Sequence, residues 1–234
     1  MVSSCALLLV AFWNRNDIPS GVDYHPELRE EPRQRRTRKR PFETGYAGIT
    51  YQVNPQYEYD LYGMVVSYRH HDGESTMHKM SNDHLNTADI CVVWGDNLDA
   101  DLLSKLKFWN GIFTCNVSTS DRAAWSRFDM NQLSNNHLIS ADDFLRRRIE
   151  NVKVGDQIRI RGWLASYGGA GAPVRGTSTT RTDAGNGACE TIFVDQFAVL
   201  VSPFRPWRAA LWGAAIVLLL SLGLHFALPH RVRS

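Results

Sequence analysis

The segment VGDQIRIRGWLASY, residues 154–167, decides the fold. It opens with a Gly-Asp turn, after which Ile158 and Ile160 alternate with Arg159 and Arg161. Apolar and polar residues that alternate with a period of two are typical of a half-buried β-strand. The segment therefore predicts a strand with one face in a core, and the rest of the domain is interpreted outward from it.

Strands also dominate the remainder of the predicted domain. Tyr, Val and Ile enrichment predicts four more of them, at residues 57–70, 90–95, 111–119 and 190–201. The sequence SADDFLRRRIENV (140–152) predicts a helix, since Ser140 can cap it and its acidic residues precede its arginines. We expect those arginines on its solvent face. A shorter helix is predicted within residues 99–109.

The order strand, strand, strand, helix, strand, strand is that of an OB-fold, a five-stranded, partly open β-barrel. GDQIRIRGWL (155–164) and TIFVDQFAVL (191–200) resemble the fourth and fifth strands of OB domains. The resemblance covers most of the predicted domain. The expected class is therefore mainly β and OB-fold-like, with one helix between strands 3 and 4. An SH3-like barrel and an unrelated α+β sheet are the alternatives.

The predicted globular domain covers residues 42–203. Residues 14–41 have four prolines and no apolar periodicity, which predicts a polar linker. Six of the eight residues at 33–40 are basic, although the whole chain has a net charge of only +2. Such a run is typical of a solvated, flexible segment. Contact with anionic lipid headgroups or nucleic acid is the alternative.

The end of the chain predicts a membrane span. Residues 209–228 contain no Asp, Glu, Lys or Arg, and twenty residues are enough to cross a bilayer as a helix. Trp207 and Trp212 lie near one end, where indole rings favour the membrane interface. A transmembrane helix is therefore expected at 207–229. The apolar residues 1–13 are too short to span comfortably and are a possible second anchor.

Two long polar loops, at residues 69–89 and 168–188, occupy the places from which OB-folds bind their ligands. The second loop could bind an anionic or sugar ligand, or it could only form the turn that leads into the last strand. Its candidate ligand-binding residues are Arg175, Thr180, Arg181, Asp183 and Glu190.

The cysteines allow several interpretations. Cys91 and Cys115 lie in segments expected to be neighbouring strands, so they could form a disulfide and leave Cys189 free; burial as small apolar residues is the alternative. Cys189 could be a nucleophile with His137 as its base, oriented by Asp183 or Glu190. Alternatively, His137 and the two preceding asparagines hold the start of the helix by hydrogen bonds to the backbone.

Histidines crowd the first long loop. Imidazole and carboxylate groups bind Zn²⁺ or Cu²⁺, but their spacing here matches no known motif, and a polar loop is the competing interpretation. The weak metal candidates are His70, His71, His78 and His84. The sequence predicts no cofactor.

Two phrases, LSNNHLISADD (133–143) and STTRTDAGNGACETIFV (178–194), resemble uncharacterised proteobacterial proteins with an N-terminal membrane anchor and an apparently extracytoplasmic domain. The resemblance implies a bacterial envelope location and no particular activity. This chain departs from that pattern in its C-terminal span and longer polar loops.

The leading hypothesis is a non-enzymatic binding or assembly module in the bacterial inner membrane, with its domain in the periplasm. Its expected partners are the lipid bilayer and an envelope protein, and its oligomeric state is open. One alternative is an enzyme that uses Cys189 and His137. The other is a cytoplasmic binder of single-stranded nucleic acid that uses residues 33–40 and stacks bases on Tyr57, Tyr59, Tyr62 and Trp94, for which core packing is the simpler interpretation.

Overall fold

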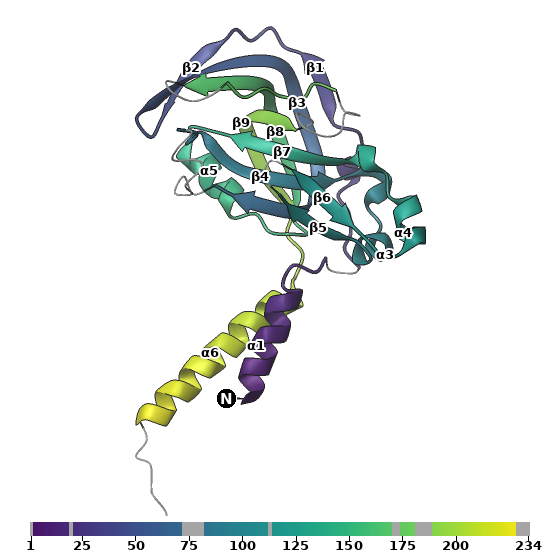
Figure 1. Cartoon of the computed structure of the whole chain (residues 1–234), viewed down its shortest axis with the longest axis vertical. Helices are drawn as coiled ribbons and strands as arrows, with labels where there is room; N and C mark the ends of the chain where they lie inside the picture. The colour runs from purple at the N-terminus through teal and green to yellow at the C-terminus, as the bar shows by residue number, and fades with distance from the viewer. Residues whose placement is uncertain are drawn as a thin grey trace, which may run out of the picture.

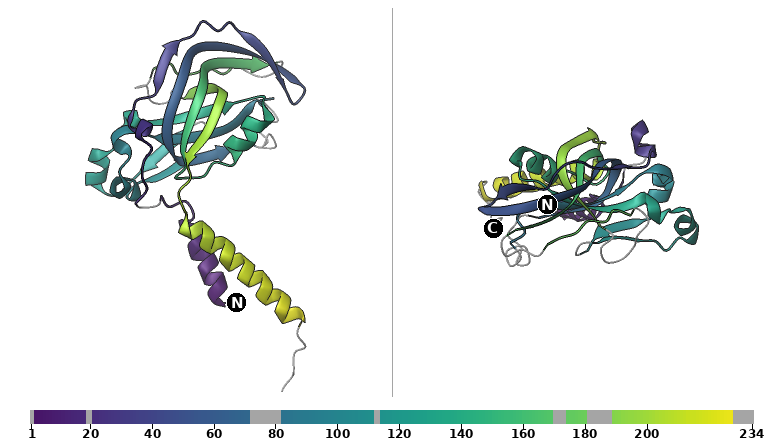
Figure 2. Two further views of the ribbon diagram at one scale, coloured as in Figure 1. Left: turned by 180° about the vertical axis from the view of Figure 1, so that it is seen from behind. Right: turned by 90° about the horizontal axis from the view of Figure 1, so that it is seen from above.

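The computed structural model describes residues 2–18, 21–71, 82–111, 114–169, 174–180 and 189–227. Most strands build one domain, from which two helices project side by side (Figures 1 and 2). These helices are α1 (Val2–Asn14) and α6 (Pro206–Ala227). The predictions of a mainly β protein and of a C-terminal apolar helix are confirmed.

The main sheet has seven strands. Its path is β1 (Arg33–Arg36), β3 (Ile49–His70), β4 (Asn86–Val93), β7 (Leu133–Ile139), β9 (Glu190–Val201) and β8 (Gln157–Gly169), with β2 (Phe42–Tyr46) also paired to β3. All pairs are antiparallel except β7 with β9. Since β8 also pairs with β3, the two ends of the path β3-β4-β7-β9-β8 are hydrogen-bonded to each other.

Strand β3 is central to this arrangement. Its residues 51–64 pair with β8 along one edge, and its other edge pairs in turn with β2, β1 and β4. Ala47 and Gly48, which join β2 to β3, have φ of 50° and 76°. Such a left-handed two-residue turn matches the twist of a β-hairpin. β1 and β2 therefore form, with a break at residues 37–41, one antiparallel arm of a hairpin whose other arm is β3.

The prediction for the third strand is wrong. Cys115–Ser118 is β6, which pairs with β5 (Lys107–Asn110) in a separate two-stranded sheet. The third strand of the main-sheet path from β3 is instead β7, whose sequence LSNNHLI shows no clear apolar alternation. The helix predicted within 99–109 is also shorter, because α3 (Ala100–Ser104) ends before β5 begins.

Helix α5 (Asp143–Glu150) confirms the predicted helix, but its cap differs. Asp142 caps it, accepting backbone N–H groups of Phe144 and Leu145 at 2.7 and 3.0 Å, so the predicted Ser140 cap is wrong. Arg146 is buried rather than on the solvent face. Its guanidinium donates to the carbonyls of Leu85 and Ser140, which fastens α5 to the segment before β4.

The segment predicted as a linker is partly built into the domain. It contains the 3₁₀ turn η1 (Pro26–Arg29), whose Leu28 is fully buried, and strand β1. The side chain of Gln157 accepts the N–H of His25 at 2.7 Å and donates to the carbonyl of Asp23 at 2.8 Å. These contacts hold the chain against the start of β8.

Two main cores lie on either side of the sheet. Buried side chains from β3, β4, β7, β8, β9 and α5 form the first. The second joins β3 and β4 to the short elements η1, η2 (Gly95–Asn97), α3, α4 (Arg122–Arg127), β5 and β6, near η3 (Met130–Gln132). A disulfide between Cys91 and Cys115 links β4 to β6 across this second core. The disulfide alternative is thus the one seen, and Cys189 is free of any disulfide.

Gly162 gives a test of the packing of β8 on β9. It lies at a shift in their register, and a Cβ there would overlap the carbonyl of Phe193. We expect Gly162→Ala to lower the free energy of unfolding by about 1–3 kcal/mol, because the backbones cannot separate freely. Gly45→Ala in β2 is the control, since its Cβ would meet only the Ile49 oxygen at 3.9 Å. Urea unfolding of the detergent-solubilised chain measures both, and equal stabilities would contradict this packing.

Candidate functional site

The ends of the two long loops meet in the structure. Arg175 belongs to the described part of the second loop, and Asp83 lies near the end of the first. Nε of Arg175 is 2.9 Å from Oδ2 of Asp83. The backbone of Arg175 also exchanges hydrogen bonds of 2.8 and 3.0 Å with Tyr167 at the end of β8. The described parts of the two loops are therefore in contact through Arg175.

A buried carboxylate lies beneath this meeting point. Asp89 on β4 is 1% exposed. Its Oδ1 lies 2.7 Å from Nδ1 of His137, and its Oδ2 lies 3.0 Å from Nε2 of His71. Burial alone would raise the pKa of Asp89, but the hydrogen bonds and charge of the two histidines outweigh it. The pKa of Asp89 is held well below its ordinary value, so this carboxyl is ionised.

The network continues from His137 to the first loop. Nε2 of His137 lies 2.9 Å from the hydroxyl of Tyr167, which donates to Oδ1 of Asp83 at 2.8 Å. Burial, followed by the negative charge of Asp83, raises the pKa of Tyr167 well above its ordinary value, so the phenol keeps its proton.

Tyr167 and His137 connect the two carboxyl groups. The Tyr167 hydroxyl gives its one proton to Asp83, and Nε2 of His137 lies on the other side of that oxygen. Nδ1 of the same ring faces the ionised Asp89. One chain of contacts therefore runs from Arg175 through Asp83, Tyr167 and His137 to Asp89.

A second set of polar side chains extends from this network along the same side of β7. Asn135, two residues before His137, donates to Sγ of Cys189 at 3.2 Å. Its own Oδ1 lies 3.5 Å from Nδ2 of Asn110 on β5, and Oδ1 of Asn110 accepts the Ser67 hydroxyl at 2.6 Å. These contacts join the β5–β6 hairpin to the end of the second loop.

The geometry does not provide the Cys189–His137 pair that catalysis needs. Both ring nitrogens of His137 lie at hydrogen-bonding distance from Asp89 and Tyr167, so neither is left to take a proton from the thiol. His137 is 3% exposed and therefore closed to substrate. The alternative that it holds the start of the helix through the backbone also differs from what is seen, because its partners are side chains.

The other candidate residues have different surroundings. Arg175 is part of the network, Thr180 is exposed and donates its N–H to Ser178, and Glu190 is buried at the start of β9. The candidates Arg181 and Asp183 lie outside the described residues, and nothing is concluded about them.

The described histidines of the first loop have separate surroundings. His71 belongs to the network, whereas burial, followed by the charges of Lys153 and His71, lowers the pKa of His70 to about 4. The backbone N–H of His84 donates to the Tyr51 hydroxyl. His78 lies outside the described residues. Among the residues that the structure describes, no three His, Cys, Asp or Glu side chains could hold a metal ion.

Sequence reasoning missed two members of the network, Asp89 and Tyr167, and considered Asp83 only as a carboxylate beside the loop histidines. One signal was present, since Asp89 is a charged residue that directly precedes the apolar run ICVVW, where burial demands a partner. Comparison of the chain with protein-family models, curated proteins and solved structures finds no match. The site must therefore be interpreted from its own geometry.

Removing one hydroxyl tests the network. Tyr167→Phe leaves Asp83 and His137 without the group between them, so we expect the free energy of unfolding to fall by about 1–3 kcal/mol. Tyr68→Phe is the matched control, because the Tyr68 hydroxyl makes no hydrogen bond within the described part of the chain. Thermal unfolding compares the two, and an equal loss in both variants would contradict the network.

The network also predicts a pH dependence. The depressed pKa of Asp89 stabilises the fold above the ordinary carboxyl pKa of about 4, and this contribution is lost as the pH falls through the folded value. Asp89→Asn should therefore cost about 3–5 kcal/mol near neutral pH, with the difference from the unaltered protein shrinking below about pH 4. Urea titrations from pH 3 to 7 measure this difference in the free energy of unfolding. A difference that stays constant over this pH range would exclude an ionised Asp89.

Proposed function

We propose that this chain is a membrane-anchored, non-enzymatic binding or assembly module of the bacterial envelope, with its domain on the periplasmic side of the inner membrane. The observation that carries the proposal is helix α6. It has 22 residues, about 33 Å of helix, and is long and apolar enough to cross a membrane. Large apolar side chains along it, such as Leu219 and Leu224, face outward rather than into the domain.

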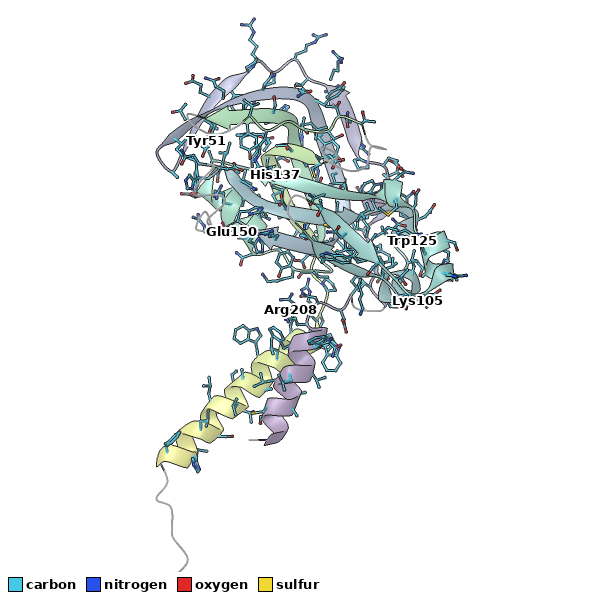
Figure 3. All side chains as sticks on the ribbon, in the orientation of Figure 1. Tyr51, Lys105, Trp125, His137, Glu150 and Arg208 are labelled. Atoms are coloured by element: carbon cyan, nitrogen blue, oxygen red, sulfur yellow. A yellow bond between two sulfur atoms is a disulfide. The ribbon has the colours of Figure 1, made fainter. Side chains whose placement is uncertain are left out.

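Contacts at the domain end of α6 support a defined position relative to a bilayer. Arg205 donates from Nε to the carbonyl of Val154 at 2.9 Å and pairs with Asp156. Arg208, which Figure 3 shows at the junction between the helices and the domain, donates to Asn16 just after α1 at 2.7 Å. The start of α6 is thus tied to the turn before β8 and to the segment after α1, which would hold the domain close to the membrane surface.

The disulfide between Cys91 and Cys115 supports placement outside the cytoplasm, because disulfides form and persist in oxidising compartments. The disulfide also argues against a cytoplasmic nucleic-acid binder, since a reducing cytosol would keep both thiols free.

We further propose that β3, β4, β7, β8 and β9 form an OB-fold. Three observations support this: the hydrogen-bonded return from β8 to β3, the parallel pair β7–β9, and α5 between β7 and β8. Ligands of that fold contact strands 2 and 3 and the loops after strands 1 and 4. Here those strands are β4 and β7, which carry Asp89 and His137. The buried network would act as a support that fixes both loop ends below a binding surface.

Thiol labelling tests the placement. Ser126 is exposed on α4 and is replaced by cysteine in a background with Cys5→Ala and Cys189→Ser. This variant has one accessible free thiol, because Cys91 and Cys115 stay paired in the disulfide. In whole cells with a permeabilised outer membrane, we expect an impermeant maleimide to label this variant and not the same background with Ser126 retained. Labelling only after lysis, together with reactive thiols at Cys91 and Cys115, would contradict a periplasmic domain.

A further inference from the structure

The basic run at residues 33–40 is part of the sheet rather than a free tail. We name these residues the cationic edge. They hold six of the 26 basic residues of the chain and none of its 24 acidic ones, so the rest of the chain has a net charge of −4. All six cationic side chains are exposed, and the first three lie on strand β1.

Most of this positive charge is uncompensated. Arg35 pairs with Glu58 at 2.6 Å, and Lys39 lies 3.6 Å from the centre of the Trp163 ring. The other four have no carboxylate within ion-pair distance in the described part of the chain: Arg33, Arg36, Arg38 and Arg40. Elsewhere in the domain, Arg127 and Arg159 each pair with an aspartate. The cationic edge is distinguished by its density of positive charge, since six of its eight residues are basic and none is acidic.

One side of the β1 main chain has no strand partner among the described residues. Within the described residues β1 pairs with β3 and no other strand, and it stands at the end of the sheet path. An edge strand presents N–H and C=O groups that another strand can pair with. Gln34, between two arginines, donates to the carbonyl of Thr179 at 2.9 Å. This contact holds β1 against the end of the second loop, so the open edge is fixed in place.

The position of the edge excludes one anionic partner. Strands β1 and β2 lie at the end of the domain opposite α1 and α6 (Figures 1 and 2). In a chain anchored by α6, the cationic edge therefore faces away from that bilayer, so the headgroups of the same membrane are not its counter-charge.

We propose that the cationic edge docks an acidic, extended segment of a partner protein, which adds to β1 as a further strand. Strand addition uses main-chain hydrogen bonds for affinity and side chains for selection. Arginine suits this role because its planar guanidinium can bind a carboxylate through two parallel hydrogen bonds. Positive charge on an edge also repels another copy of the same edge, so it selects acidic strands and prevents self-pairing.

A labelled peptide tests the proposal on the full chain in non-ionic detergent. The probe is a fluorescent ten-residue peptide in which Glu alternates with Val and Thr. We expect saturable binding that weakens as NaCl rises from 50 to 500 mM. A triple variant should bind the peptide at least tenfold more weakly: Arg33→Glu with Arg38→Glu and Arg40→Glu. These three arginines make no ion pair in the described structure, so the variant should fold. Arg147→Glu with Arg148→Glu, on the exposed face of α5, is the control for added negative charge away from β1 and should bind normally.

Three further probes separate strand addition from simple charge attraction. The same peptide N-methylated at alternate residues keeps its carboxylates but loses half of its main-chain donors, and we expect its binding to be lost. Heparin and single-stranded DNA are the polyanion probes. Equal binding of the N-methylated peptide, tighter binding of either polyanion, an equal loss in the α5 control, or no binding of the acidic peptide would each overturn the proposal. None of these outcomes depends on which side of the membrane the domain occupies.

Discussion

The structure depends on the requirement that both edges of the 22-residue strand β3 find backbone partners. β8 covers one edge, whereas β2, β1 and β4 follow one another along the other. Register shifts after Pro55 and after Val65 interrupt this pairing at two points, and Figure 1 shows β3 arching over the sheet. Because β8 returns to β3, Tyr167 at the far end of β8 reaches His137 on β7, and the polar network becomes possible.

Burying these charged and polar side chains costs free energy, and we infer that the network serves to specify the strand register. A buried ion pair of this kind adds little stability over well-packed apolar side chains. A one-residue slip of β7 against β4, however, would turn His137 to the opposite face and leave Asp89 buried without its partner. The six linked side chains come from the ends of both loops and from three strands. Their charges therefore specify one alignment of these strands, which apolar contacts alone would not do.

The sequence predicted the elements whose signal is local. Alternation in residues 154–167, acidic residues before arginines in α5, and the uncharged stretch of α6 each need no distant partner to be recognised. The third strand was misplaced because polar residues of LSNNHLI are buried and make hydrogen bonds to groups far along the chain. For the same reason Cys189 and His137 were joined in a hypothesis, although the true partners of His137, Asp89 and Tyr167, lie 48 and 30 residues away. The arginines of β1 carry no strand signal at all, and that strand exists because β3 offers an edge.

The proposed anchor and the cationic edge lie at different levels of the same strands. β8 begins at Gln157, whose side chain ties down the segment after α1, and β9 ends at Val201, which pairs with Gln157 and is joined to α6 by residues 202–205. Farther along, the register of β8 on β3 places Gly162 and Trp163 opposite the residues that pair with β1. A partner strand bound at β1 would therefore be joined to the base of the domain through hydrogen-bonded strands. The short segment between β9 and α6 is held by Arg205, which contacts Val154 and Asp156, so a load on the cationic edge would reach α6 through this fixed junction.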